Sequence, residues 1–338
     1  MIQIDGSFGE GGGQILRSSL ALSMVTGKSV RIEKIRGGRS KPGLMRQHLT
    51  AVQAARRICG GHTTGDQIGS STVTFEPGPV EGGDYAFGIG TAGSTTLVLQ
   101  TILLPLLCAD KPSRITLDGG THNPFAPPFD FLERAYLPLV NRMGPRVRAT
   151  LERPGFFPAG GGRIVVEIEP APRLSGFELL ERGDLRRRHA RAAVANLPAS
   201  IGEREVAVIR KRMAWSDEEL DIDRVTSSRG PGNIVTLTLT FDHVTEVFTG
   251  FGETRRSAEA VATHAVQACQ RYLRRSAPVG EFLTDQLMLP MALAGEGAFS
   301  SIGLSRHAET HIELIRRFLD VPISVFAGPD DAKTITIG

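Results

Sequence analysis

The chain has 338 residues, of which 41% are hydrophobic and 22% charged, and its formal net charge is +3. This balance is typical of a globular protein with a large core and more than one domain, and it argues against a general coating of nucleic acid. The longest apolar run, "TTLVLQTILLPLLCA", is interrupted by Gln100 and Pro105 and is too short to cross a bilayer. The three cysteines form no CxxC pair and the N-terminus lacks a signal-peptide layout, so we expect a reduced, cytoplasmic protein without a zinc ribbon.

Positive charge is concentrated in the first 60 residues. They hold ten Lys or Arg residues against three Asp or Glu residues, which leaves the remainder of the chain with a formal charge of −4. One glycine-rich loop, "GEGGGQ", leads into an apolar helix, and a second, "RGGRSKPG", connects a short strand to a helix that ends near Gly60. Arginines in a glycine-rich loop do not fit a solvated helix face. We therefore expect an anionic ligand at one place in this region.

Residues 88–144 follow the same layout as the first 60. The loop "GIGTAGS" leads into an apolar helix, and the strand "SRITLDGG" is followed by a helix that ends near Gly144. Gly37 and Gly119 lie 82 residues apart, and Pro42 and Pro124 keep that offset. Each unit thus holds two helices and several strands, about the size of a small α+β module. We expect "FPAGGGR" to turn the chain at the end of the second unit.

Residues 182–276 have a different character. They contain the only tryptophan, arginine-rich turns, the strands "NIVTLTLTF" and "HVTEVFTGF", and helices near 201–213 and 256–274. Repeat-like sequence resumes after them. We interpret this segment as an inserted small α/β domain, and the alternative is that it continues a single domain.

The C-terminal segment predicts a third, less regular unit. "GEFLTDQLMLPMALAG" supplies a first helix, "FSSIG" a strand and "SRHAETHIELIRRFL" a second helix, and "ISVFAG" and "KTITI" are the closing strands. His307 then occupies the start of the helix that Pro42 and Pro124 open in the other units. Loops that enter equivalent helices in pseudo-symmetric units converge, which favours a functional role for His307.

The environment of His307 suits a nucleophile. Ser305 is the expected N-cap, so His307 lies in the first helical turn. The positive end of the helix dipole disfavours an imidazolium ion there, and the ring keeps a free lone pair. A surface histidine without a chemical role is the alternative that the helix alone does not exclude.

Two other kinds of site match short patterns. "GIGTAGS" fits the dinucleotide fingerprint GxGxxG, but it lies in the second unit, and a nicotinamide-binding domain needs it in the first βαβ unit. His307 and His311 are spaced as two zinc ligands on one helix face, but the order H-A-E-T-H differs from H-E-x-x-H and no third ligand is evident. Neither pattern is sufficient by itself.

A set of longer motifs resembles the RNA 3′-terminal phosphate cyclase family and spans nearly the whole chain in family order. The motifs are "DGSFGEGGGQILRSSLALS", "RGGRSKPGLMRQHLTAVQA", "GTAGSTTLVLQT", "GGTHNPFAPPFDF", "FPAGGGR", "RGPGN", "DQLMLPMALAG" and "SRHAETHI". The resemblance implies an α+β fold of three repeated units, each with two helices on a four-stranded sheet, interrupted by a small α/β domain. The catalytic repeat domain would then be residues 1–181 and 277–338, and the inserted domain residues 182–276.

The resemblance also implies a three-step reaction. A histidine that aligns with His307 attacks the α-phosphorus of ATP and forms a histidine–AMP phosphoramidate. The AMP passes to an RNA 3′-phosphate, giving an RNA(3′)pp(5′)A anhydride, and the neighbouring 2′-hydroxyl displaces AMP to leave a 2′,3′-cyclic phosphate. The enzyme would be an ATP-dependent, nucleotidyl-transferring ligase in RNA processing. The alternative is a non-catalytic RNA- or ribosome-associated binding protein of the same fold.

Further site residues follow from the resemblance, position by position. Those at the catalytic and phosphate end are Glu10, Arg17, Arg36, Arg39, Arg46 and Gln47, the last two and Arg39 being the expected contacts of the RNA phosphate. Those at the adenylate end are Gln100, Phe282, Leu283, Thr284, Asp285 and Gln286. Glu10 is also the expected ligand of Mg²⁺ or Mn²⁺. Phe282, Arg306 and His311 depart from the residues usual in the family. The implied partner is RNA with a 3′-phosphate end, a homodimer is compatible with the resemblance, and no membrane association is expected.

Overall fold

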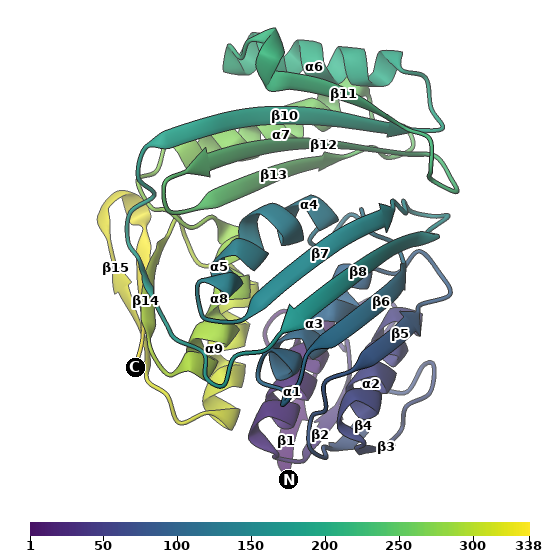
Figure 1. Cartoon of the computed structure of the whole chain (residues 1–338), viewed down its shortest axis with the longest axis vertical. Helices are drawn as coiled ribbons and strands as arrows, with labels where there is room; N and C mark the ends of the chain where they lie inside the picture. Colours follow the sequence, from purple (N-terminus) through teal and green to yellow (C-terminus); the bar gives the residue numbers. More distant parts are fainter.

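The computed structural model describes residues 1–338 as four mixed four-stranded sheets with helices packed against them (Figure 1). The fold is therefore α+β, as the sequence predicts. None of the helices combines the length and apolar composition needed to span a membrane.

The N-terminal sheet has the strand order β1-β2-β4-β3. Strand β1 is parallel to β2, and β4 is antiparallel to both of its neighbours. The elements in chain order are β1 (Ile2–Asp5), α1 (Gly13–Thr26), β2 (Val30–Glu33), α2 (Arg46–Cys59), β3 (His62–Thr64) and β4 (Val73–Glu76).

The second sheet has the order β5-β6-β8-β7, with the same sequence of one parallel and two antiparallel pairings. The elements are β5 (Asp84–Gly88), α3 (Thr95–Leu107), β6 (Ser113–Gly119), α4 (Phe129–Phe131), the π-helical turn Leu132–Tyr136, α5 (Leu137–Asn141), β7 (Arg146–Arg153) and β8 (Gly162–Glu169). The "FPAGGGR" segment connects β7 to β8, so it lies within this sheet, and the expectation that it ends the unit is wrong.

The C-terminal sheet has the order β9-β14-β16-β15, again with one parallel and two antiparallel pairings. The elements are β9 (Glu178–Leu179), α8 (Glu281–Ala294), β14 (Gly297–Ser301), α9 (Arg306–Phe318), β15 (Ile323–Ala327) and β16 (Lys333–Ile337). In all three sheets, one helix follows the first strand and another follows the second.

The fourth sheet lies in sequence between β9 and α8, and it has the order β11-β10-β12-β13. Its elements are β10 (Leu185–Ala195), α6 (Ser200–Met213), β11 (Leu220–Val225), β12 (Gly232–Phe241), β13 (Thr245–Phe251) and α7 (Ala258–Leu273). The arginine-rich stretch expected to form turns is the long strand β10, whose arginines are exposed or half-buried. Charged side chains conceal such a strand because strands are normally recognised by β-branched and aromatic residues.

One continuous cluster of buried apolar side chains includes residues from all four sheets. Helix α1 contacts α2, α3 and α9, so it joins the N-terminal sheet to the elements of the two others. Helix α3 is buried nearly all round, which fits its almost wholly apolar sequence. Helices α1, α3, α8 and α9 therefore lie close together in the part of the molecule that holds these three sheets, below the fourth sheet in Figure 1.

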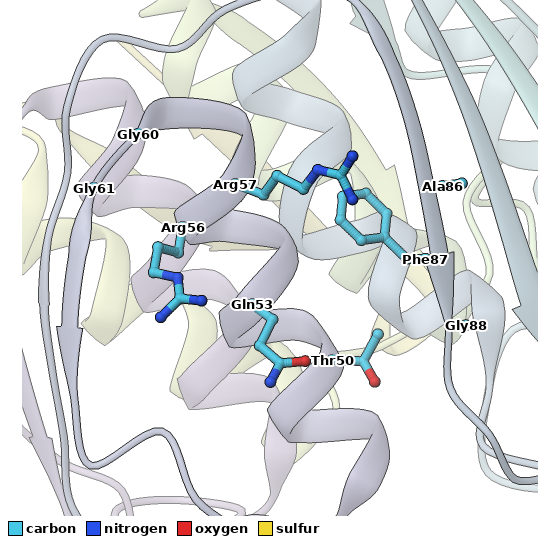
Figure 2. A pocket seen from close by; sticks show the side chains of 9 residues that line it. All are labelled: Thr50, Gln53, Arg56, Arg57, Gly60, Gly61, Ala86, Phe87 and Gly88. Atoms are coloured by element: carbon cyan, nitrogen blue, oxygen red, sulfur yellow. The ribbon is translucent and has the colours of Figure 1, made fainter.

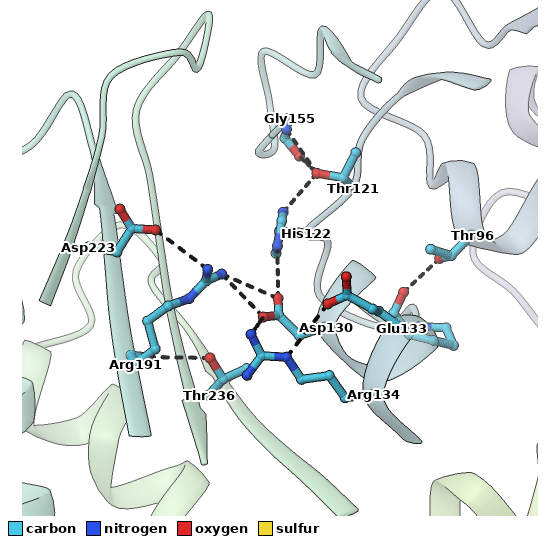
Figure 3. A network of polar contacts seen from close by, with 11 residues as sticks. Thr96, Thr121, His122, Asp130, Glu133, Arg134, Gly155, Arg191, Asp223 and Thr236 are labelled. Carbon is cyan, nitrogen blue, oxygen red and sulfur yellow. Dashed lines mark hydrogen bonds and ion pairs between the residues drawn. The ribbon is translucent and has the colours of Figure 1, made fainter. Parts of the chain in front are cut away.

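A buried polar network connects the fourth sheet to the rest (Figure 3). Asp130 of α4 accepts a hydrogen bond from Nε2 of His122 at 3.1 Å, and its other carboxylate oxygen lies 3.2 Å from a guanidinium nitrogen of Arg191 on β10. Burial raises the pKa of Asp130, but the contacts with His122, Arg191 and Arg134 outweigh it and the pKa is lowered. The carboxylate is thus ionised and fixed at this junction.

Candidate active site

His307 lies in the first turn of α9. The hydroxyl oxygen of Ser305 accepts a hydrogen bond from the backbone N–H of Ala308 at 3.1 Å, which confirms the predicted N-cap. The side chain of His307 is 48% exposed, so one edge of the ring is accessible while the other packs against the protein. The position combines access for a ligand with a fixed ring.

Gln14, near the start of α1, determines the tautomer of His307. The amide nitrogen of Gln14 donates to Oδ1 of Asp285 at 2.5 Å, because an ionised carboxylate can only accept. The amide oxygen therefore faces His307 and accepts from Nδ1 at 3.0 Å. With its proton on Nδ1, the neutral ring has a lone pair on Nε2.

Nε2 of His307 faces the carboxylate of Glu10, whose Oε1 lies 3.9 Å away. Burial lowers the pKa of His307; Asp285 opposes this shift, while the charges of Arg17 and Arg39 add to it. The ring is thereby kept neutral at physiological pH, as the helix position alone predicts.

A continuous chain of polar side chains connects helices of the three sheets and ends at this histidine. Asp285 accepts from Gln14 and, through its second oxygen, from the amide of Gln286 at 3.2 Å. Gln286 in turn accepts from the amide of Gln100 at 2.5 Å, and Gln100 accepts from Nε of Arg17 at 3.3 Å. Helices α1, α3 and α8 thus position one another, and α9 joins through His307.

The arginines of the site differ in whether other protein groups already occupy their guanidinium nitrogens. Arg39 forms an ion pair with Glu10. Arg17 is half-buried, and the loss of hydration lowers its pKa to about 10, while no carboxylate pairs with it. Arg36 donates to the backbone oxygens of Lys41 and Gly43 at 2.6 and 3.0 Å, so part of its guanidinium holds its own loop in shape.

The N-terminus of α2 lies beside these arginines. Its N-cap, Met45, provides no side-chain hydrogen bond, and no acidic residue lies in the first turn. Arg46 is exposed there, and Gln47 accepts from the backbone N–H of Ser94 at 2.6 Å, which leaves its amide N–H groups free. Uncapped N–H groups and the positive helix end both favour an anion.

Two of the expected adenylate contacts have buried side chains. Leu283 and Thr284 are fully buried, and the hydroxyl of Thr284 donates to the backbone oxygen of Gly280 at 2.9 Å. Their side chains pack in the core and leave only the backbone for contact with a nucleotide, so a role of these two residues in adenylate binding stays a prediction. They follow the helical period of α8, which turns them inwards. Phe282 is 75% exposed at the start of α8.

The two unusual residues near His307 support its helix. Arg306 donates to the backbone oxygen of Gly9 at 3.2 Å. His311 is buried, with Nε2 3.0 Å from the hydroxyl of Ser18 and Nδ1 3.2 Å from Oδ1 of Asp285. His311 therefore helps to fix Asp285, and it is not free to act as a second nucleophile.

The residues at hand fit a divalent ion only together with a phosphate ligand. No group of three or more His, Cys, Asp or Glu side chains is arranged to hold a metal by itself. Glu10 offers a single, mostly buried carboxylate next to His307. Mg²⁺ is commonly held by one or two carboxylates together with substrate phosphates, so Glu10 fits as the protein's contribution.

Comparison with known proteins identifies the family. A family model described as RNA 3′-terminal phosphate cyclase matches residues 8–325. The relative from Koribacter versatilis is 50% identical over 325 residues, covering 96% of this chain and 92% of its own length. Those from Ralstonia nicotianae and Pseudomonas fluorescens are 51% and 49% identical, cover 97% and 100% of this chain, and span 94% and 97% of their own lengths. All three bear the name RNA 3′-terminal phosphate cyclase.

The chain belongs to the RNA 3′-terminal phosphate cyclase family. The name that these relatives share is that of an enzyme.

Sequence reasoning did not single out Gln14 and His48 of this cyclase-family chain. Gln14 has a usable signal, since it precedes Arg17 by three residues and the two therefore share one face of α1. His48 carries no comparable signal. It packs where a side chain at Gly13 would stand, and burial, together with Arg17 and Arg36, lowers its pKa to about 3.

Proposed function

We propose that this protein converts an RNA 3′-terminal phosphate into a 2′,3′-cyclic phosphate at the expense of ATP, with His307 as the nucleophile. The observation that carries the proposal is the hydrogen bond between Nδ1 of His307 and Gln14, which leaves the Nε2 lone pair free among Glu10, Arg17 and Arg39. Such a nitrogen reacts with an electrophile without first losing a proton.

In the first step, Nε2 attacks the α-phosphorus of ATP. An N–P bond forms, the bond to the bridging oxygen breaks, and pyrophosphate leaves with the electron pair. Arg17 and Arg39 suit the negative charge that develops, because a planar guanidinium pairs with two phosphate oxygens at once. Gln100 and Gln286, already ordered beside Arg17, are the proposed adenylate contacts, with Asp285 holding them.

In the second step, an oxygen of the RNA 3′-phosphate attacks the AMP phosphorus, the N–P bond breaks and His307 regains its lone pair. The RNA 2′-hydroxyl then attacks the 3′-phosphorus, loses its proton, and AMP leaves. Arg39, Arg46 and the free amide of Gln47 are proposed to hold the RNA phosphate. The uncapped start of α2 supports this placement, since free N–H groups at the start of a helix favour an anion.

Glu10 is proposed to hold Mg²⁺ or Mn²⁺ together with the nucleotide phosphates. A bound divalent ion would neutralise charge on the phosphate oxygens. The position of the Glu10 carboxylate supports this assignment, because Oε1 lies 3.9 Å from Nε2 of His307, next to the proposed place of reaction.

We also infer that the three sheets with the same strand order are copies of one unit, and that residues 1–181 and 277–338 form one catalytic domain. Their matching pairing directions and helix positions support this interpretation. Residues 182–276 are then an insertion between the first strand and the first helix of the third unit.

The direct test incubates the protein with ATP, Mg²⁺ and an oligoribonucleotide that ends in a 3′-phosphate. The proposal predicts ATP-dependent formation of a phosphatase-resistant cyclic end and of AMP. A His307→Asn variant should form neither, while its melting temperature should stay near that of the wild type. Binding of the RNA without cyclisation would contradict the proposal and favour the non-catalytic binding protein.

A further inference from the structure

A groove lies between α2 and strand β5 (Figure 2), and His307 is not among the residues that line it. It has a volume of about 550 Å³. One wall is the face of α2 that carries Thr50, Gln53 and Arg57, and the other is the strand segment Ala86–Gly88. No acidic side chain is among the residues that line it.

The chemistry of the groove is dominated by positive charge, and its aromatic residue, Phe87, is buried with 8% of its surface exposed. The guanidinium of Arg57 lies over the ring of Phe87, 5.9 Å from its centroid, and no carboxylate pairs with it. Arg56 lies next to it and is paired with Asp66 at 3.2 Å, with both side chains partly exposed. Solvent-exposed pairs of this kind are weak, so a phosphate can compete for Arg56.

Both walls of the groove lead to the phosphate end of the proposed active site. Helix α2 runs from Arg57 back to Gln47, a distance of about 15 Å at 1.5 Å per residue. Strand β5 ends at Gly88, and the loop after it reaches Ser94, whose backbone N–H is bound by Gln47. A side-chain carbon placed at Gly88 would meet nothing within 4 Å, so the groove is open at this point.

Strand β5 is also an edge strand, because only β6 pairs with it. Its free edge leaves backbone N–H and C=O groups without a partner in the sheet, and these can bind the sugars or bases of a ligand. The groove therefore offers cations and polar backbone groups side by side, with Arg57 lying over the buried ring of Phe87.

We propose that this groove binds the single-stranded RNA segment that precedes the 3′-phosphate, with its backbone phosphates on Arg56 and Arg57. The inference rests on the proposed function, which places the terminal phosphate at Arg46 and Gln47. Single-stranded nucleic acids bind along positively charged grooves through phosphate contacts and stacking. At about 3.4 Å per stacked nucleotide, 15 Å accommodates roughly four nucleotides.

The test compares Arg57→Gln with wild type in fluorescence anisotropy, using 3′-phosphorylated oligoribonucleotides of two to eight nucleotides. For the wild type, affinity should rise with length up to about four or five nucleotides and then level off. Arg57→Gln should bind the eight-mer about tenfold more weakly and the dinucleotide with unchanged affinity. Its salt dependence should fall by about 0.7 for each lost phosphate contact.

Arg148→Gln, on strand β7 of the second sheet, is the matched control, because it removes an exposed arginine outside the groove. Its binding curves should match those of the wild type. Equal affinity of Arg57→Gln and wild type for every length overturns the inference, and so does an equal loss at all lengths. Covalent attachment of AMP to the wild type during incubation with ATP is measured in parallel. If no AMP is attached, the proposed function is refuted, while the dependence of affinity on RNA length still shows whether the groove binds RNA.

Discussion

At the residue scale, two sets of neighbours act on His307 in different ways. Gln14 determines which ring nitrogen carries the proton, because its amide nitrogen is committed to Asp285. Arg17 and Arg39 act on the charge of the ring, which they help to keep neutral. Orientation and protonation are thus controlled separately, and each can be tested separately.

Gln14→Leu should slow the transfer of AMP to the protein by about 10- to 100-fold, the usual cost of losing a residue that orients a reacting imidazole. Without the acceptor at Nδ1, the ring can rotate and its proton can move to Nε2. Single-turnover labelling at several ATP concentrations checks this. The maximal rate should fall while the ATP concentration for half-maximal rate stays nearly constant, whereas a purely structural role for Gln14 predicts a fall in melting temperature with normal labelling.

The pH dependence of labelling follows from the lowered pKa of His307. The attacking form is the neutral ring, so the rate should be level above pH 6.5, the ordinary value of histidine, and should decline only at lower pH. Arg39→Gln removes one positive charge near the ring and should move this decline to higher pH. A decline that begins above pH 6.5 in the wild type would show that the ring is not held neutral.

At the element scale, α8 is anchored from outside its own sheet. The backbone N–H of Gly280, the N-cap of α8, donates to Oε1 of Glu246 on β13 at 2.6 Å. Glu246 is buried, and this raises its pKa from 4.5 to about 8. The helix that carries Asp285 and Gln286 therefore depends on a carboxyl group that is neutral at neutral pH.

The raised pKa of Glu246 makes stability depend on pH. Between pH 4.5 and about 8 the folded protein holds a proton on Glu246 that the unfolded chain has released, so this group's contribution to the free energy of unfolding falls as pH rises. Glu246→Gln, which is neutral at every pH, should melt at an increasingly higher temperature than wild type as pH rises from 5 to 8. Exposed Glu313→Gln is the control. A constant difference between Glu246→Gln and wild type would refute the assignment.

Most helices could be predicted from sequence because their signals are local. Apolar periodicity and Ser305 located α9, and the glycine loops located α1 and α3. Strand β10 was missed because its arginines mask the pattern of a strand. The inward orientation of Leu283 and Thr284 was also missed, since the resemblance marks a stretch of sequence and not the face of α8 that a nucleotide would contact.

At the scale of the whole molecule, the fourth sheet is joined to the others by apolar packing and by Asp130. This carboxylate forms a hydrogen bond with His122 and an ion pair with Arg191, two residues that are 69 positions apart in the chain. Such a junction cannot be read from sequence, because no spacing rule links strands of different sheets. The convergence of α1, α3, α8 and α9 on one polar chain is likewise visible only in the fold, although the resemblance named most of its members.

Arg191→Met should lower the free energy of unfolding by about 2 kcal/mol, because the Asp130 carboxylate stays buried with one fewer cation. Arg146→Met removes an exposed pair with Glu169, 3.8 Å apart, and should cost less than about 0.5 kcal/mol. Urea denaturation measures both variants. Equal losses would mean that the buried network contributes no more than a surface pair.

The central claim is that Nε2 of His307 accepts AMP from ATP. Incubation with ATP and Mg²⁺, digestion with trypsin at neutral pH and fragmentation of the peptide His307–Arg316 by mass spectrometry test it most directly, because this peptide also contains His311 as an internal comparison. The account predicts one AMP per chain, attached to His307 and removed by mild acid. AMP on His311, or no covalent AMP in a folded protein that binds ATP, would contradict it.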